Sequence, residues 1–519
     1  MKRFILAILI LIIAAPIVAQ TSNDSLANLI EAGNRKAALE RIRAGADVNA
    51  PQPDGTRPIH WAVYHVDYEL LGALIARKAN VNVRNEFGVT PIAEAARIAD
   101  ARMVKMLLDA GAEPEGVNQD GQTALMLAIK TGEVPVVDML LKAGANANRI
   151  EEFHNQTPLM WAAAAPINAG AMVRLLLAKG ADFKPRALYT DWPSQITSEP
   201  RAQYRPVGGL TALLYAARDG CYDCVDALIA AGANVDLPTP EGVTALMLAL
   251  DNDHNDVAKL LLDRGANPAL WDWWGRTALY IAVDRKNPVA QTGGGAASSP
   301  VARRDSVRVS SMEIISALLA SDIDINARLN FHRPSRSGNS GRFIEPLLGA
   351  GCTPLMRATV GMWSPDNNDK GGDLEVARVL LAKGANPNIN DMGVTPFLVA
   401  AGVNAGVTGG TGLAAQWSAA PPANMELMEL LLQHGANVND QVTGTLTYSM
   451  RVTRAPSANE GLTALHIAAM EGKTDLVRYL LGKGANPEIT DVGGKKAIDL
   501  VKADAAEIRS LLQNAAARK

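Results

Sequence analysis

Residues 121–148 read GQTALMLAIKTGEVPVVDMLLKAGANAN, and this order of small, apolar and polar residues decides the fold. Thr123 precedes an apolar run rich in Ala and Leu, where its hydroxyl is suited to cap the first turn of a helix. A second apolar run ends in Leu140-Leu141, and Gly144 follows it as a left-handed helix end. The asparagine-rich tract after Gly144 suits a turn. The stretch therefore predicts a helix, a second helix and a hairpin-like finger.

The same pattern recurs along nearly the whole chain. Successive tracts start at residues 45, 78, 111 and 144, and again at 232 and 265, so four intervals measure 33 residues each. A unit of this length cannot bury its own apolar face, so a fixed period predicts units that stack on one another. The tracts start at Gly45, Gly111, Gly144, Gly180, Gly232, Gly265, Gly384, Gly435 and Gly484, with degenerate copies at Lys78 and Asp322.

A second signature follows each tract. It reads Pro58-Ile59-His60-Trp61-Ala62 early in the chain and Gly461-Leu462-Thr463-Ala464-Leu465-His466-Ile467-Ala468-Ala469 late in it. With the 33-residue period, this motif resembles the Thr-Pro-Leu-His-x-Ala signature of the ankyrin-repeat family. The resemblance covers about residues 24–515 and implies an all-α ankyrin-repeat solenoid of about twelve units, with a β-hairpin-like finger in each. Atypical end units are expected as caps, the last from Lys495 to Leu512.

Six insertions break the regular spacing. Three lengthen fingers, after Gly180, Asp322 and Gly435, and three open the turn between the two helices, after Thr277, Thr353 and Thr395. We expect one solenoid over residues 20–515, with regular repeats at about 24–182 and 209–268. The insertion-bearing repeats span about 183–208 and 269–459, and the C-terminal repeats and cap span 460–515. Loops as long as these are either functional or disordered, and the sequence leaves both open.

Composition narrows the function further. The chain has 519 residues and a net charge of -3, so no overall basic field favours nucleic acid as a partner. Residues 1–19 show a basic start, an apolar run and a small-residue end, which predicts a signal peptide and a periplasmic or extracellular protein. An uncleaved anchor is the alternative. After cleavage we expect no membrane span and a monomer.

The sequence suggests a contact surface on one finger, Leu270-Trp271-Asp272-Trp273-Trp274-Gly275-Arg276-Thr277. The resemblance places Trp273, Trp274 and Arg276 at variable positions of the finger, and Trp and Arg dominate interface hot spots. The alternative is that neighbouring insertions fold over the rings. Arg333 and Arg336 lie in a locally basic insertion, which is either a patch for an anionic partner or a solvated loop. Trp61, Trp161 and Tyr215 share one repeat position and are interpreted as packing residues.

Few residues suggest chemistry. Cys221 and Cys224 form a C-x-x-C at the start of a second helix, which leaves open core packing, a local disulfide or redox catalysis. A buried Cys224 would argue against redox catalysis. The resemblance implies that His60 and His466 bond the backbone of the adjacent loop. We find no metal-ligand spacing and no phosphate-binding loop, so we expect no cofactor, no metal and no enzymatic activity.

These observations together predict an exported scaffold that binds a partner protein or peptide on its concave face and finger tips, with specificity set in residues 265–460. A binder of glycan or cell-wall fragments that uses Trp271, Trp273 and Trp274 is the alternative. A thiol–disulfide oxidoreductase that uses Cys221 and Cys224 is the third hypothesis.

Overall fold

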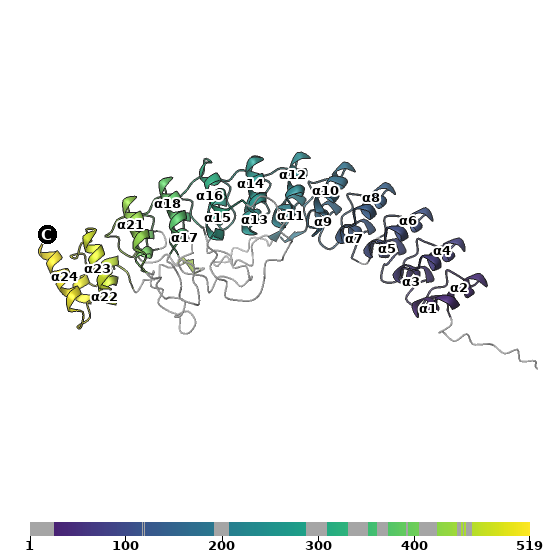
Figure 1. Cartoon of the computed structure of the whole chain (residues 1–519), viewed down its shortest axis with the longest axis horizontal. Coiled ribbons are helices and arrows are strands. Elements are labelled where there is room, and N and C mark those ends of the chain that lie inside the picture. Colours follow the sequence, from purple (N-terminus) through teal and green to yellow (C-terminus); the bar gives the residue numbers. More distant parts are fainter. Residues whose placement is uncertain are drawn as a thin grey trace, which may run out of the picture. The chain divides into compact units, whose positions relative to one another are not determined.

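Helix pairs and short fingers make up the structure, which is a computed structural model (Figure 1). It describes residues 25–116, 118, 120–190, 207–286, 309–330, 351–360, 372–390, 393–403, 423–443, 448–449, 451–452 and 459–518. The chain groups into two compact units, unit 1 up to Phe153 and unit 2 from His154 onward. The prediction of a single solenoid over 20–515 stays a prediction, and the predicted signal peptide, residues 1–19, lies outside the described residues.

Unit 1 consists of four helix pairs. In Figure 1 its first helices form one row and its second helices another. The first helices are α1 (Leu26–Glu31), α3 (Pro58–Tyr64), α5 (Pro91–Arg97) and α7 (Ala124–Thr131). The second helices are α2 (Arg35–Arg43), α4 (Tyr68–Ala76), α6 (Ala101–Asp109) and α8 (Val134–Lys142).

Unit 2 repeats the same arrangement. Its first helices are α9 (Pro158–Ala163), α11 (Ala212–Arg218), α13 (Ala245–Asp251), α15 (Ala278–Lys286), α17 (Pro354–Thr359), α19 (Pro396–Ala400) and α22 (Ala464–Glu471). Its second helices are α10 (Ala169–Ala178), α12 (Tyr222–Ala230), α14 (Asn255–Asp263), α16 (Ser311–Leu319), α18 (Leu374–Ala382), α21 (Met425–Gln433) and α23 (Thr474–Gly482). The chain ends in η4 (Ala497–Leu500) and α24 (Ala506–Ala517). Two small antiparallel pairs, β1 (Tyr189–Thr190) with β2 (Val207–Gly208) and β3 (Tyr448–Ser449) with β4 (Arg451–Val452), lie in fingers.

The motif residues begin and end the helices as the sequence predicts. Thr123 Oγ1 accepts the backbone N–H of Met126 at 3.2 Å, and equivalent threonines cap most first helices. After the second helix, Gly111 takes a φ of 88°, a left-handed conformation that glycine adopts without strain. Leu107 and Leu140 are fully buried between the helix layers, so the first leucine of each pair fills the core.

The six insertions fall where the spacing predicts. Those after Gly180, Asp322 and Gly435 lie between a second helix and the next first helix, which is the finger position. Those after Thr277, Thr353 and Thr395 lie between the two helices of a pair. The tips of these insertions, including the glycine-rich stretches 291–300 and 409–412, lie outside the described residues.

Asparagine side chains connect successive fingers. Asn82 Oδ1 accepts the N–H of Glu113 at 2.8 Å, and its Nδ2 donates to the carbonyl of Gly111 at 3.1 Å. Asn388 makes the same two bonds to the next described finger. Asp236 makes only the first kind of bond, in which its Oδ1 accepts the N–H of Asn267. The polar tract in these repeats therefore does more than turn the chain, because its fifth residue links one repeat to the next.

We predict that Asn82→Ala lowers the free energy of unfolding of unit 1 by about 1–2 kcal/mol, since it removes two hydrogen bonds. Asn82→Asp should lose about half as much, because the carboxylate still accepts from Glu113 but cannot donate to Gly111. Urea unfolding followed by circular dichroism measures both. Equal stability of Asn82→Ala and wild type would mean that these bonds contribute nothing.

Two buried histidines link the start of a first helix to the backbone of the next loop through both ring nitrogens. His60 Nδ1 accepts the N–H of Arg57 at 3.0 Å and Nε2 bonds the carbonyl of Val89 at 3.1 Å. His466 bonds Thr463 and Lys495 in the same way. Burial lowers the pKa of both histidines. The bonds to adjacent loops match what the resemblance implies.

A lowered histidine pKa makes stability depend on pH. Because the unfolded histidine has a pKa of about 6.5, the unfolded chain binds more protons than the fold just below that pH. We therefore predict that the free energy of unfolding is highest above about pH 6.5 and falls as the pH is lowered through the folded pKa values. In urea titrations at several pH values, the free energy of unfolding of the double variant His60→Met, His466→Met should fall less with decreasing pH than that of wild type. Methionine suits this test because Met126 and Met160 occupy the same repeat position. An unchanged pH profile in the variant would contradict the prediction.

Candidate interaction surface

The tryptophan finger of residues 270–277 divides into an exposed and a buried part. Trp271 is 62% exposed, whereas Trp274 is 5% exposed and Trp273 is intermediate. The carbonyl of Trp274 accepts the N–H of Asn330 at 2.8 Å, so the following finger packs beside it. The interpretation of Trp274 as an exposed contact residue is therefore wrong, while Trp271 keeps an open face.

Arg276 is also buried and internally paired. Its Nε donates to Asp272 at 2.7 Å and its Nη1 to Asp251 at 2.9 Å. Burial alone would lower the pKa of Arg276, but the two carboxylates outweigh it and raise the pKa. Asp272 is fully buried and also accepts the N–H groups of Trp274 and Arg276. Arg276 therefore holds the finger together, and its assignment as a partner-binding residue is corrected.

Further charges along the first helices of unit 2 are paired with one another. Arg357 is fully buried, and its Nε donates to Asp284 at 2.6 Å. Arg285 Nε donates to Asp253 at 2.8 Å. This stretch of the first-helix face offers few charges to a partner. Arg333 and Arg336 lie outside the described residues.

Unit 1 presents an aromatic cluster at the end of one first helix, α3. We define the aromatic face as Trp61, Tyr64 and His65. The Trp61 ring lies 5.7 Å from Tyr64 in an edge-to-face arrangement and 6.2 Å from His65 in a stacked one. Tyr64 is 55% exposed, and the Trp61 indole N–H donates to Gln52 at 2.7 Å. Fixed aromatic rings with open faces are suited to protein contacts.

The next repeat extends this face with a charged pair. Arg97 lies on α5 and bonds Glu94 through two nitrogen atoms at 2.8 and 2.6 Å. Its side chain is 53% exposed, so its remaining N–H groups face solvent. The first-helix face of unit 1 therefore combines open rings with a positioned guanidinium.

The packing interpretation of the shared repeat position applies best to Tyr215, since Trp61 and Trp161 are both half-buried. Tyr215 is 9% exposed, and its hydroxyl accepts Gln156 Nε2 at 2.7 Å, while Arg218 lies 4.8 Å over its ring. Trp161 has a buried indole nitrogen without a hydrogen-bond partner. The aromatic face was not predicted, because Trp61 was compared with Trp161 and Tyr215 in other repeats and not with its neighbours in the sequence. The available signal was the spacing of Tyr64 and His65, three and four residues after Trp61, at the end of α3.

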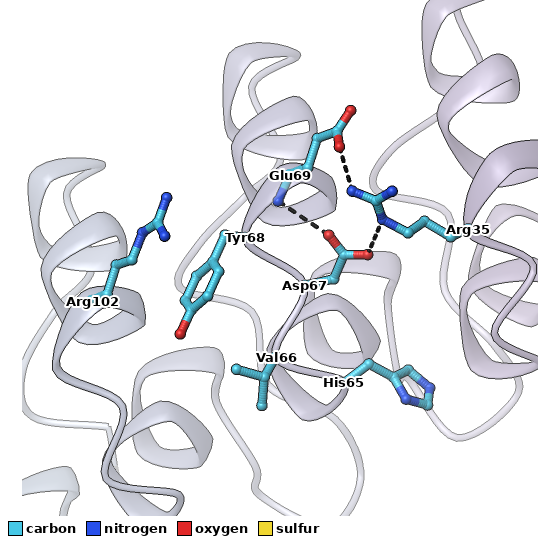
Figure 2. A pocket seen from close by; sticks show the side chains of 7 residues that line it. All are labelled: Arg35, His65, Val66, Asp67, Tyr68, Glu69 and Arg102. Carbon is cyan, nitrogen blue, oxygen red and sulfur yellow. Dashed lines mark hydrogen bonds and ion pairs between the residues drawn. The ribbon is translucent and has the colours of Figure 1, made fainter.

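A shallow, open pocket of about 510 Å³ adjoins this face (Figure 2). It lies at the turns between helices, and Arg35 points toward Asp67 and Glu69 across it. Arg102 lies 4.1 Å over the Tyr68 ring, and the Tyr68 hydroxyl donates to Asp100 at 2.6 Å. Its lining is polar and extensively paired, and it shares His65 with the aromatic face. The residues that line it are Arg35, His65, Val66, Asp67, Tyr68, Glu69 and Arg102.

Cys221 and Cys224 are joined by a disulfide bond at the start of α12. Cys224 is fully buried, which is the result that argues against redox catalysis at this pair. Cys352 is a free buried cysteine, and burial raises the pKa of its thiol to about 12. The thiol of Cys352 is therefore unreactive in the fold.

Thiol labelling should separate these cysteines. We predict that in native protein iodoacetamide labels none of the three, that reduction followed by unfolding exposes three thiols, and that unfolding alone exposes only Cys352. Mass spectrometry of the labelled peptides measures this. Labelling of Cys221 in native, unreduced protein would contradict it.

The described residues also bear on metal sites and membrane spans. Among the residues that the structure describes, no three His, Cys, Asp or Glu side chains gather as metal ligands would. Within the same residues, every helix is too short or too polar to cross a bilayer.

Comparisons with known proteins agree on one family. A model of ankyrin repeats in three copies matches residues 94–187, 196–272, 213–292 and 390–491. A model of many ankyrin repeats matches 59–108, and a single-repeat model matches 350–392.

Individual relatives match only in part. Protein phosphatase 1 regulatory subunit 27 is 30% identical in Homo sapiens and 28% in Mus musculus, each over 103 residues, or 20% of this chain and 56% of the relative. The chain thus spans about half the length of these curated relatives. The crystal structure of the human ASB11 ankyrin repeat domain is 25% identical, with 47% of this chain and 99% of that chain covered and a TM-score of 0.37. The family models match more than half of the residues and coincide with the repeated helix pairs, so the chain belongs to the ankyrin-repeat family.

Proposed function

We propose that this chain is an exported, non-enzymatic scaffold that binds a partner protein or peptide on the first-helix face of unit 1. The observation that carries the proposal is the aromatic face, in which Tyr64 is 55% exposed while Trp61 is held by Gln52. Rings that are already ordered lose little conformational freedom on binding. The relatives add support, because they are named as regulatory subunits of a phosphatase.

Export is part of this proposal. The pattern of residues 1–19 supports it, and so does the Cys221–Cys224 disulfide, since disulfides persist in oxidising compartments. Mass spectrometry of protein from its own host tests it. An N-terminus at about residue 20 in the extracytoplasmic fraction is expected, and an intact Met1 in the cytoplasmic fraction would overturn it.

A glycan is the second candidate ligand. The exposure of Trp271 favours it, because an open indole face can stack on a sugar ring. The burial of Trp274 reduces the predicted cluster to Trp271 and part of Trp273. Retention on immobilised cell-wall polysaccharide that is lost in Trp271→Ala would favour this candidate over the first.

Site-specific cross-linking tests the principal proposal. A photoreactive phenylalanine analogue replaces Tyr64 in one variant and Tyr222 in another. Tyr222 is a matched control because it is also exposed, at 44%, but begins a second helix in unit 2. We expect a discrete protein adduct from position 64 alone in the extracytoplasmic fraction. Equal adducts from both positions, or none from position 64, would overturn the proposal.

A further inference from the structure

The fingers of unit 1 carry a row of exposed or half-buried groups beside the aromatic face. We define the unit-1 fingertips as two phenylalanines and four carboxylates on consecutive fingers. Phe87 is 56% exposed and Phe153 is 58% exposed. The row consists of Asp54, Glu86, Phe87, Asp120, Glu152 and Phe153.

Direct backbone contacts hold the tips next to one another. The N–H of Glu86 donates to the carbonyl of Asp54 at 2.9 Å. Gly121 approaches Glu152 so closely that an added Cβ would lie 3.0 Å from its backbone nitrogen. The second and third fingers are joined by the bond from the N–H of Glu113 to Asn82, so the four fingers of unit 1 follow one another in a fixed order.

The charge of the fingers is acidic overall. Exposed or half-buried carboxylates outnumber the basic side chains in the four finger segments, although charges of both signs occur throughout unit 1. The carboxylates are Asp47, Asp54, Glu86, Glu113, Glu115, Asp120 and Glu152, and the basic residues are Arg57, Lys78, Arg84 and Arg149. An acidic surface attracts a basic partner and repels an acidic one. The two phenyl rings add apolar contact area between the charges.

We propose that the unit-1 fingertips bind an extended basic segment of the partner. Two apolar side chains of that segment pack on Phe87 and Phe153, and the Lys or Arg residues between them face the carboxylates. This inference rests on the proposed function and names the chemistry of the partner. Packed helices lie about 8–10 Å apart, and an extended chain advances about 3.3 Å per residue, so one finger matches about three residues. Phe87 and Phe153 lie two fingers apart, so the apolar residues of the segment are spaced by about six.

A peptide probe tests both the charge and the spacing. The probe is a fluorescein-labelled extended peptide with two leucines six positions apart and arginines between them, titrated against the full chain by fluorescence anisotropy. Two control peptides carry glutamates in place of the arginines, or the same residues with the leucines adjacent. We expect the first peptide to bind at least about 10-fold more tightly than either control, and added salt to weaken it.

Protein variants locate the binding. Two double variants should each bind the first peptide at least about 10-fold more weakly. One is Glu86→Lys, Asp120→Lys and the other is Phe87→Ser, Phe153→Ser. The control Glu40→Lys with Glu133→Lys makes the same change in net charge away from the fingers, on α2 and at the residue before α8, and should leave binding unchanged. Equal binding of all variants, or equal binding of all three peptides, would overturn the inference. If position 64 still cross-links to a partner, that result would leave the proposed function intact.

Discussion

Replacing Arg357 with alanine is expected to lower the free energy of unfolding of unit 2 by about 3–5 kcal/mol, which would be the largest single-residue effect proposed for this chain. Arg357 is fully buried on α17, and Asp284 on α15 is 6% exposed. The pair joins two successive first helices at 2.6 Å, and Arg357 also donates to the carbonyl of Val360 at 3.2 Å. The variant leaves the Asp284 carboxylate in a buried site without the guanidinium that faces it.

The double variant Arg357→Met, Asp284→Leu provides the control. Apolar residues of similar size remove both charges, and replacing a buried pair in this way is often neutral. We therefore expect urea unfolding to show most of the lost stability restored in the double variant. A loss below about 1 kcal/mol for Arg357→Ala would instead place the pair in a solvated environment.

The second large effect concerns binding. We predict that the double variant Trp61→Ala, Tyr64→Ala binds the partner recovered by cross-linking about 100-fold more weakly than wild type. Two aromatic anchors at an interface contribute about 2–3 kcal/mol or more to the free energy of binding. Isothermal titration calorimetry with the purified partner measures the affinity. The rings act together, because Tyr64 packs edge-on against Trp61.

Two controls keep this prediction interpretable. Tyr222→Ala removes a tyrosine of similar exposure from unit 2 and should leave the affinity unchanged. Thermal unfolding by circular dichroism checks that the double variant is folded, since Trp61 also bonds Gln52. A folded double variant with wild-type affinity would remove the aromatic face as the site.

The fold could be predicted because its determinants are local and repeated. Thr123 caps a helix and Gly111 ends one through contacts within a few residues, so each motif reports its own conformation. The leucine pairs indicated the buried side of the second helices for the same reason. The disulfide was one of three alternatives, because residue spacing does not decide whether Cys221 and Cys224 are oxidised.

The site was harder to predict because it depends on contacts between repeats. Trp274 and Arg276 occupy variable positions, yet the backbone of Asn330 and the carboxylate of Asp251 belong to neighbouring repeats and help to enclose them. Long insertions separate some of these repeats in the sequence. Tyr64 and His65 lie outside the family motif, so only their helical spacing relative to Trp61 indicated a cluster.

Hydrogen–deuterium exchange of the full chain, measured with and without the purified protein that cross-links at position 64, tests where the partner binds. We predict that the partner slows exchange in the first helices and fingers of unit 1, in peptides that cover residues 58–65 and 84–98. Exchange in the second helices, residues 68–76 and 101–109, should change little. Slowed exchange confined to those second helices, or to residues 265–460, would show that the first-helix face of unit 1 is not the binding site.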